Sequence, residues 1–329
     1  MSKYNIDNVR FVMSWTKLVA ALLTINLIGS IACGAGFSWK DTEGKYLDLL
    51  YDGRKVTRYM YDSDESSEQR IFETYKVFHH VFDEKGNNLL TNGPDGENPY
   101  TKSVKYPHHR GIFIGWNKLQ FEGKSYDTWH MTKGVRQVHQ KFLEKKADAV
   151  KATSTALIHW KNGDGVVMVE EKRTTTVYRP GNGTIVQLDF ETEMKAPNGE
   201  VYLNGDPEHA GFQYRPHDDV AKGPADVKAK YLFHKDRIDP KKDTDLPWVT
   251  LEYELNGKQY SVLYMSDPAN PNSDAVYSAY RDYGRFGEFF KHTIPAGQTL
   301  KLRYRIRVSE GSLPDRKTLA KQYAAFTKN

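Results

Sequence analysis

Apolar and polar side chains alternate strictly in two stretches, and this pattern constrains the fold more than any other feature of the sequence. Between Thr184 and Met194, apolar residues take most even positions, and charged or polar residues take the odd positions from 187 on. A second stretch, from Leu300 to Val308, repeats the pattern with four basic residues at its polar positions. Successive side chains of a strand point to opposite faces, so a period of two predicts half-buried β-strands. We expect the basic side chains of the second stretch to form a solvated strand face.

Short turns separate other apolar runs. Asp52-Gly53 lies between "YLDLLY" and "RKVTRYMY", and Asn256-Gly257 lies between "WVTLEYEL" and "KQYSVLYM". Gly181-Asn182-Gly183 precedes the stretch that begins at Thr184. These residues tolerate a positive φ, which a tight reversal between antiparallel strands requires.

Only the tail from Leu313, "LPDRKTLAKQYAAF", has a helical pattern, with Pro314 near its start. Many strands, short turns and few helices predict an all-β fold, a large antiparallel β-sandwich with a short C-terminal helix. We expect such a sandwich to offer a concave sheet face to a ligand.

The N-terminus has the pattern of a secretory signal peptide. Arg10 and Lys17 precede the apolar run Leu18 to Ala35, which ends in small residues. The run could instead be a single anchoring helix, because its length approaches that of a bilayer span. We therefore expect residues 1–36 to be a signal peptide and residues 37–329 to form a single β-sandwich domain, exported to the periplasm or the extracellular space.

The only cysteine, Cys33, lies inside that segment, so the exported part cannot form an intrachain disulfide. "SIAC" is a poor lipobox, yet lipid anchoring at Cys33 stays an alternative. After cleavage no integral membrane domain is expected.

The charge and the motif content exclude several classes of partner. The whole chain carries a formal charge of +5, and residues 1–36 hold three basic residues and one acidic residue, which leaves +3 for the remainder. This is weak for a nucleic-acid-binding protein, which usually has a strong basic stripe. No GxGxxG, P-loop, HExxH or GxSxG motif is present, which disfavours nucleotide cofactors and serine-hydrolase chemistry.

Three clusters combine imidazoles with aromatic, acidic or basic residues. They are "YPHHRGIFIGW" at 106–116, "YDTWHM" at 126–131 and "DPEHAGFQYRP" at 206–216. Burying charged groups is costly unless they bind one another or a ligand, so three such clusters predict a shared functional site.

Together with "YRDYGRFGEFF" near the C-terminus, these motifs resemble a family of exported bacterial proteins commonly labelled methane oxygenase PmoA, otherwise a domain of unknown function. The resemblance covers the chain from about Thr74 onward. It implies a galactose-mutarotase-like β-supersandwich of the kind often associated with carbohydrate utilisation. A membrane methane monooxygenase subunit needs several spanning helices, and the sequence has one apolar run, so the family label is misleading about activity.

Residue by residue, the resemblance nominates ten positions in the three clusters. They are His108, His109, Arg110, Asp127, Trp129, His130, Glu208, His209, Gln213 and Arg215. Substrate binding to a sugar needs forked donors and acceptors such as Arg110, Gln213 and Arg215, an aromatic platform such as Trp116 or Trp129, and polar neighbours such as His108 and Asp127. Acid-base catalysis needs a neutral histidine and a glutamate of raised pKa, and the candidates are His109, His130, Glu208 and His209.

A strand beginning near His109 would point His108 and His109 to opposite sides, so only one of them need serve the site. We expect Arg110 to be exposed at the edge of the cleft, and Gly111 and Gly115 to permit close approach by a ligand or another backbone. No cofactor is certain. A divalent metal is possible, because three imidazoles and a carboxylate can bind one, although the adjacent Glu208 and His209 would face opposite ways on a regular strand.

The sequence therefore favours an exported carbohydrate-active enzyme, a lyase, hydrolase or epimerase, whose partner is a carbohydrate or another small polar ligand. One alternative is a non-catalytic glycan-binding protein that uses the same cleft. A second is a metal-dependent oxygenase, as the family label suggests.

Overall fold

The computed structural model describes residues 36–101, 103–181, 183–223, 228–271 and 274–328. The expected signal peptide, the alternative anchoring helix and Cys33 lie outside these ranges. In the part of the chain that is described, no helix is both long enough and apolar enough to span a membrane.

The first sheet has eight antiparallel strands. In spatial order they are β1 (Phe37–Thr42), β2 (Tyr46–Tyr51), β3 (Arg54–Met60), β4 (Phe78–Val81), β5 (Ile112–Trp116), β13 (Ala210–Tyr214), β18 (Phe286–Phe289) and β17 (Val276–Tyr277).

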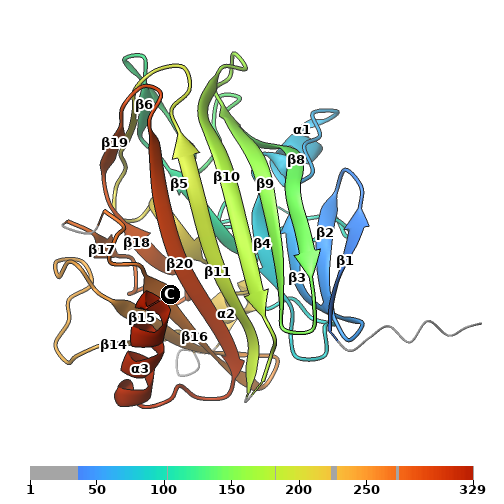
Figure 1. Ribbon diagram of the computed structural model, residues 1–329, viewed down its shortest axis with the longest axis vertical. Helices are drawn as coiled ribbons and strands as arrows, with labels where there is room; N and C mark the ends of the chain where they lie inside the picture. The colour runs from blue at the N-terminus through green and yellow to red at the C-terminus, as the bar shows by residue number, and fades with distance from the viewer. Residues whose placement is uncertain (1–35, 102, 182, 224–227, 272–273, 329) are drawn as a thin grey trace, which may run out of the picture. The chain divides into compact units, whose positions relative to one another are not determined.

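The second sheet also has eight antiparallel strands. In spatial order they are β14 (Lys230–Phe233), β15 (Trp248–Leu255), β16 (Lys258–Ser266), β20 (Thr299–Glu310), β11 (Thr184–Lys195), β10 (Val167–Tyr178), β9 (Lys151–Lys161) and β8 (Arg136–Ala147). Its long strands β20, β11, β10, β9 and β8 run side by side in Figure 1.

A smaller third sheet and three short helices complete the described residues. The third sheet contains, in order, β19 (His292–Ile294), β12 (Val201–Leu203), β6 (Leu119–Phe121) and β7 (Lys124–Tyr126). The helices are α1 (Glu68–Thr74), α2 (Asp218–Lys222) and α3 (Arg316–Thr327).

The two large sheets pack face to face through aromatic side chains. Phe212 of β13 lies 4.4 Å from Phe190 of β11 and 4.5 Å from Tyr304 of β20, measured between ring centroids. All three rings are fully buried. The prediction of an all-β antiparallel sandwich with a short C-terminal helix is confirmed.

The predicted turns lie where the sequence places them. Asn256 and Gly257 have φ angles of 55° and 71° and join β15 to β16. Both residues take the left-handed conformation that a two-residue hairpin turn requires. Asp52 and Gly53 do the same between β2 and β3, with φ angles of 50° and 79°.

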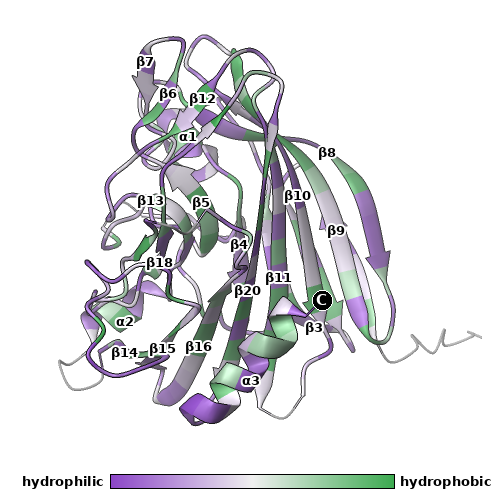
Figure 2. Ribbon diagram, turned by 60° about the vertical axis from the view of Figure 1, so that its left-hand side comes forward, coloured by the Kyte–Doolittle hydropathy of each residue, from purple (hydrophilic) through white to green (hydrophobic). Residues whose placement is uncertain are grey.

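The C-terminal helix covers part of the second sheet, which corrects one expectation. Asp315 caps α3 by accepting a hydrogen bond from the main-chain N–H of Thr318, and Phe326 is buried near the other end. The guanidinium of Arg305 lies 5.0 Å from the Phe326 ring and is paired with Asp189 of β11. Arg305 is therefore buried, so the prediction of a solvated basic face is wrong there. Figure 2 shows α3 beside β16 and β20.

Candidate metal centre

Three loops bring three histidines together at one place. His108 precedes β5, His130 lies between β7 and β8, and His209 lies between β12 and β13. One ring nitrogen of each lies within 4.8 Å of those of the other two. The ring centroids of His108 and His130 are 4.3 Å apart, and those of His130 and His209 are 5.1 Å apart. We call these three residues the histidine cluster.

Asp127 orients the second histidine of the cluster. Its Oδ1 accepts the main-chain N–H groups of Trp129 and His130, at 3.0 and 2.8 Å. Its Oδ2 lies 2.9 Å from Nδ1 of His130. A carboxylate at this distance accepts a hydrogen bond from Nδ1–H of a neutral imidazole, which leaves the lone pair of Nε2 free to bind a metal.

Asp206 repeats this arrangement at the third histidine. Its Oδ1 accepts the main-chain N–H of Glu208 at 3.0 Å and lies 2.8 Å from Nδ1 of His209. Its Oδ2 accepts a hydrogen bond of 2.7 Å from the side chain of Asn117. Both loops thus contain an Asp-x-x-His turn, in which the aspartate side chain forms hydrogen bonds with the backbone of the turn and with the imidazole.

His108 joins the cluster through a different support. The ammonium group of Lys76 donates to the main-chain carbonyls of His108, at 3.1 Å, and of Trp129. Nε2 of His108 is buried and has no hydrogen-bond partner among the described residues. Burial, with smaller contributions from His130 and Lys76, lowers the pKa of His108 to about 2. This imidazole is therefore neutral at physiological pH, the form that binds metals.

Two glycines of the first motif allow backbone, rather than ligand, to come close. A Cβ at Gly115 would lie 2.3 Å from the carbonyl oxygen of Thr128, and one at Gly111 would lie 2.2 Å from that of His79. Thr128 also bonds Trp116 of β5 twice through its hydroxyl, at 2.9 and 2.8 Å. Gly115 therefore lets the loop that carries His130 dock directly on β5.

His109 lies beside the cluster without being one of its three members. Its ring centroid is 4.2 Å from that of His108, and the residue is 2% exposed. Neither ring nitrogen has a hydrogen-bond partner in the described structure. Burial holds the pKa of His109 well below its usual value, and Arg285 lowers it further. Its catalytic role stays a prediction.

Glu208 lies next to His209 in the sequence, but its ionisation differs from the expected one. Its Oε1 pairs with the guanidinium of Arg281 at 2.7 Å and accepts a hydrogen bond of 3.1 Å from Tyr280. The hydrogen bond from Arg281 is the main reason that the pKa of Glu208 is lowered. The expectation of a raised pKa is wrong, so Glu208 is ionised and is not suited to donate a proton.

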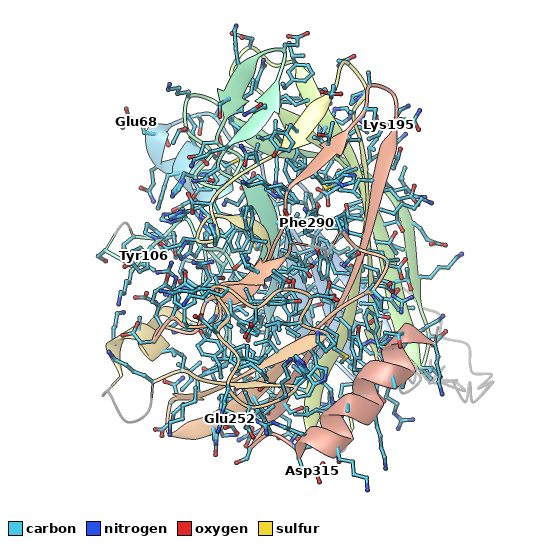
Figure 3. The ribbon with its side chains drawn as sticks, turned by 90° about the vertical axis from the view of Figure 1, so that its left-hand side faces the viewer. Glu68, Tyr106, Lys195, Glu252, Phe290 and Asp315 are labelled. Carbon is cyan, nitrogen blue, oxygen red and sulfur yellow. The ribbon has the colours of Figure 1, made fainter. Side chains whose placement is uncertain are left out.

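Arg110 and Trp116 are structural residues. Arg110 is fully buried and donates to the main-chain carbonyls of Phe72 and Glu73 at the C-terminal end of α1. Trp116 is also fully buried, and its indole N–H donates to the carbonyl of Phe290, 3.1 Å away, a residue labelled near the middle of Figure 3. The expectations of an exposed cleft arginine and of an aromatic platform at Trp116 are therefore wrong.

Replacing Arg110 with alanine should lower the free energy of unfolding by about 2 to 4 kcal/mol, because it removes a buried side chain and its cation-π contacts. The guanidinium lies between 4.7 and 5.9 Å from the rings of Phe72, Tyr75, Phe78 and Tyr100. Urea unfolding measures the loss, and the exposed Arg54→Ala is the control that should change little. If R110A has normal stability but no longer binds ligand, the structural role is wrong and Arg110 is a ligand-binding residue.

Three further nominated residues are buried near the cluster. Trp129 is fully buried, with ring centroids 5.6 Å from His109 and 6.0 Å from His209. Gln213 accepts a hydrogen bond of 2.8 Å from Arg285. Arg215 is fully buried and paired with Asp218 at 3.2 Å, which makes it a structural ion pair rather than a ligand-binding group.

Four residues around the cluster were not nominated from the sequence. They are Lys76, Asp206, Arg281 and Arg285. The repeated Asp-x-x-His spacing in "DTWH" and "DPEH" is a signal that could have identified Asp206. Arg281 and Arg285 lie in "YRDYGRFGEFF", which carries the family resemblance but nominates no residue, and Lys76 lies in none of the three clusters.

No curated protein matches the chain. Among solved structures, a heparan sulfate lyase HepC mutant from Pedobacter heparinus aligns with a TM-score of 0.43 and 9% identity, over 84% of this chain and 37% of the lyase. A GalM/aldose epimerase homologue from C. elegans aligns with a TM-score of 0.36 and 10% identity, over 84% of this chain and 99% of the homologue. This chain therefore spans little more than a third of the lyase. Residues 46–324 match a family of unknown function, DUF6807, and the chain belongs to that family.

Proposed function

We propose that this protein is a divalent-metal-dependent enzyme that acts on a carbohydrate, with His108, His130 and His209 as its metal ligands. The observation that carries the proposal is the convergence of three imidazole nitrogens within 4.8 Å of one another. Two of these imidazoles are held by carboxylates through Nδ1. Carboxylate, histidine and metal in this order form the usual outer support of zinc sites.

The number of ligands indicates a catalytic rather than a structural centre. Structural zinc sites are closed by four protein ligands, whereas catalytic ones keep a position for water or substrate beside three. Imidazole ligands suit zinc and also iron, copper and nickel. Such an ion would polarise a substrate oxygen or lower the pKa of a bound water, and Glu208 beside His209 could accept the released proton.

The polar groups beside His209 support a sugar as substrate. Glu208, Tyr280 and Arg281 form a hydrogen-bonded group next to His209 and offer a carboxylate, a phenol and a guanidinium. Sugar hydroxyls both donate and accept hydrogen bonds, which this mixture of groups satisfies. The resemblance to exported proteins of carbohydrate utilisation favours the same class, and a lyase, hydrolase or epimerase reaction would each be compatible with it.

The test is to measure bound metal and turnover on the same purified sample. We expect about one ion per chain, because the cluster offers one set of three ligands. A panel of mono- and oligosaccharides, including oxidised sugars, should contain a substrate whose turnover stops after chelation and returns with added metal. Turnover that chelation does not change would overturn the metal assignment. Sugar binding without turnover would favour the glycan-binding alternative, and consumption of oxygen would favour the oxygenase.

A further inference from the structure

Arg285 is a fully buried guanidinium that has no carboxylate partner among the described residues. It is 1% exposed, and its Nη1 donates to two neutral groups, Oε1 of Gln213 at 2.8 Å and Oγ of Ser278 at 3.1 Å. Its Nε has no partner in the described structure. An isolated buried charge is expensive, so this arrangement calls for an anion that the described residues do not supply.

The other fully buried arginines are compensated. Arg58 pairs with Asp48 at 2.6 Å, and Arg173 pairs with Glu171 at 2.7 Å. Arg215 pairs with Asp218. Arg110 has no carboxylate among the partners found for it either, but it donates to the main-chain carbonyls at the end of α1, which hold its guanidinium. Arg285 has neither a carboxylate nor a helix end, and it lies over the ring of Trp129, which is close to His209 of the cluster.

A second buried basic group, Lys76, lies beside the cluster. Lys76 is 2% exposed, and the hydrogen bonds found for its ammonium group go to the carbonyls of His108 and Trp129, not to a carboxylate. Glu208 is paired with Arg281, and Asp127 and Asp206 keep their negative charges beside neutral histidines. A bound divalent ion would offset these two aspartates, which leaves the charge of Arg285 without a counter-ion.

Unpartnered hydrogen-bonding atoms gather around Arg285. Its guanidinium carbon lies 5.3 Å from the ring of Trp129, whose Nε1 is buried without a partner in the described structure. Both ring nitrogens of His109 and Nε2 of His108 are also buried without a hydrogen-bond partner in the described structure. Indole and guanidinium N–H groups only donate, so the missing partner must be an acceptor.

We propose, on the basis of the function proposed above, that the substrate is an acidic sugar and that Arg285 binds its carboxylate. A carboxylate has two oxygens and no proton to donate at neutral pH, so it can accept from Arg285 and from Trp129 together. It also supplies the negative charge that Arg285 lacks. The sugar hydroxyls then reach the metal and the polar groups beside His209.

The experiment compares zinc-loaded protein with matched acidic and neutral sugars, using calorimetry and thermal shift. The probes are glucuronate, galacturonate and their oligomers against glucose, galactose and the corresponding neutral oligomers, with a sulfated glucose as a separate anion. We expect the uronates to bind at least about tenfold more tightly than the neutral sugars, as a buried charge pair allows. Equal affinity for both, no uronate binding, or preference for the sulfated sugar would overturn the proposal.

Arg285→Met tests the residue itself. We expect it to weaken uronate binding by about 30-fold or more while the zinc content stays the same. The melting temperature without ligand should not fall, because the variant removes an uncompensated buried charge. The matched control is Arg173→Met, which removes an equally buried arginine that has a partner and should lower the melting temperature. Unchanged uronate binding in R285M would overturn the role of Arg285.

If R285M does not fold, the comparison of acidic and neutral sugars on the wild-type protein decides the proposal alone. Failure of the two proposals can be told apart on the same samples. Zinc binding without preference for uronates refutes the acidic substrate only. Uronate binding that depends on Arg285 in a protein that takes up no metal refutes the metal centre only.

Discussion

Replacing His209 with alanine is expected to lower the affinity for zinc by about 100- to 1000-fold and to abolish turnover. Four-ligand zinc sites contribute about 10 to 16 kcal/mol, which assigns about 3 to 4 kcal/mol to each ligand. His209 is about a third exposed, so its loss should leave the fold intact. Competition with a chromogenic chelator measures the affinity, and circular dichroism checks the fold.

Two further variants test whether the loss of zinc affinity is specific to the histidine cluster. Asp206→Asn keeps the shape of the side chain that bonds His209 but removes its charge, and it should weaken zinc binding by about tenfold. His159→Ala, on β9 of the second sheet, removes a partly exposed histidine outside the cluster and should not change zinc binding. The metal assignment is wrong if H209A binds zinc as the wild type does, or if all three variants lose zinc equally.

The fold could be predicted because its signals are local. The alternation from Thr184 to Met194 is the half-buried strand β11, and the Asn256-Gly257 turn joins two strands directly. The order of strands in the sheets could not be predicted, because β5 pairs with β13 across almost a hundred residues. The sequence of one strand alone does not show which distant strand it pairs with.

The histidine cluster could be predicted in part. His108, His130, His209 and Asp127 stand in motifs that combine imidazoles with charged residues, and the structure brings them together. The expected strand at His109 begins only at Ile112, because Tyr106 has a φ of 55° and the preceding residues form a loop. His108 and His109 therefore do not lie on a strand, so their side chains need not point to opposite faces, and their rings are in contact.

Buried charges were the main source of error. Arg110 was expected at a cleft because a charged residue suggests solvent or a ligand. Its partners are instead the carbonyls at the end of α1 and four aromatic rings, which come from segments some 10 to 40 residues away. Lys76 and Arg285 were missed for the same physical reason, since burial and the lack of a counter-charge are properties of the folded chain.

Glu288, on β18, is expected to make the stability depend on pH between about 4.5 and 7. Its carboxylate is 1% exposed and accepts hydrogen bonds from Ser266 at 2.9 Å and from Tyr277 at 3.2 Å. Burial is the main cause that raises the pKa of Glu288 to about 7, from 4.5 for the free group. The other titratable groups that interact with it are Tyr264, Tyr277, Tyr304, Tyr323 and Asp245.

The sign of this effect follows from proton binding. Below pH 4.5 both the folded and the unfolded chain hold this proton, so its titration does not change the free energy of unfolding. Between pH 4.5 and 7 the unfolded chain releases it and the folded chain keeps it, so stability falls as the pH rises. Above pH 7 both have lost the proton, and the full penalty of about 3 kcal/mol remains.

Glu288→Gln should therefore stabilise the protein at pH 8 by up to about 3 kcal/mol and have little effect at pH 4.5, because the amide is neutral throughout. Urea unfolding of both proteins at a series of pH values measures the difference. Glu193→Gln, at a half-exposed position of β11, is the matched control and should give the same difference at each pH. The opposite result, E288Q less stable than wild type at pH 8, would mean that the folded core prefers the ionised carboxylate. In that case the hydrogen bonds from Ser266 and Tyr277 would outweigh the effect of burial, and the raised pKa of Glu288 would be wrong.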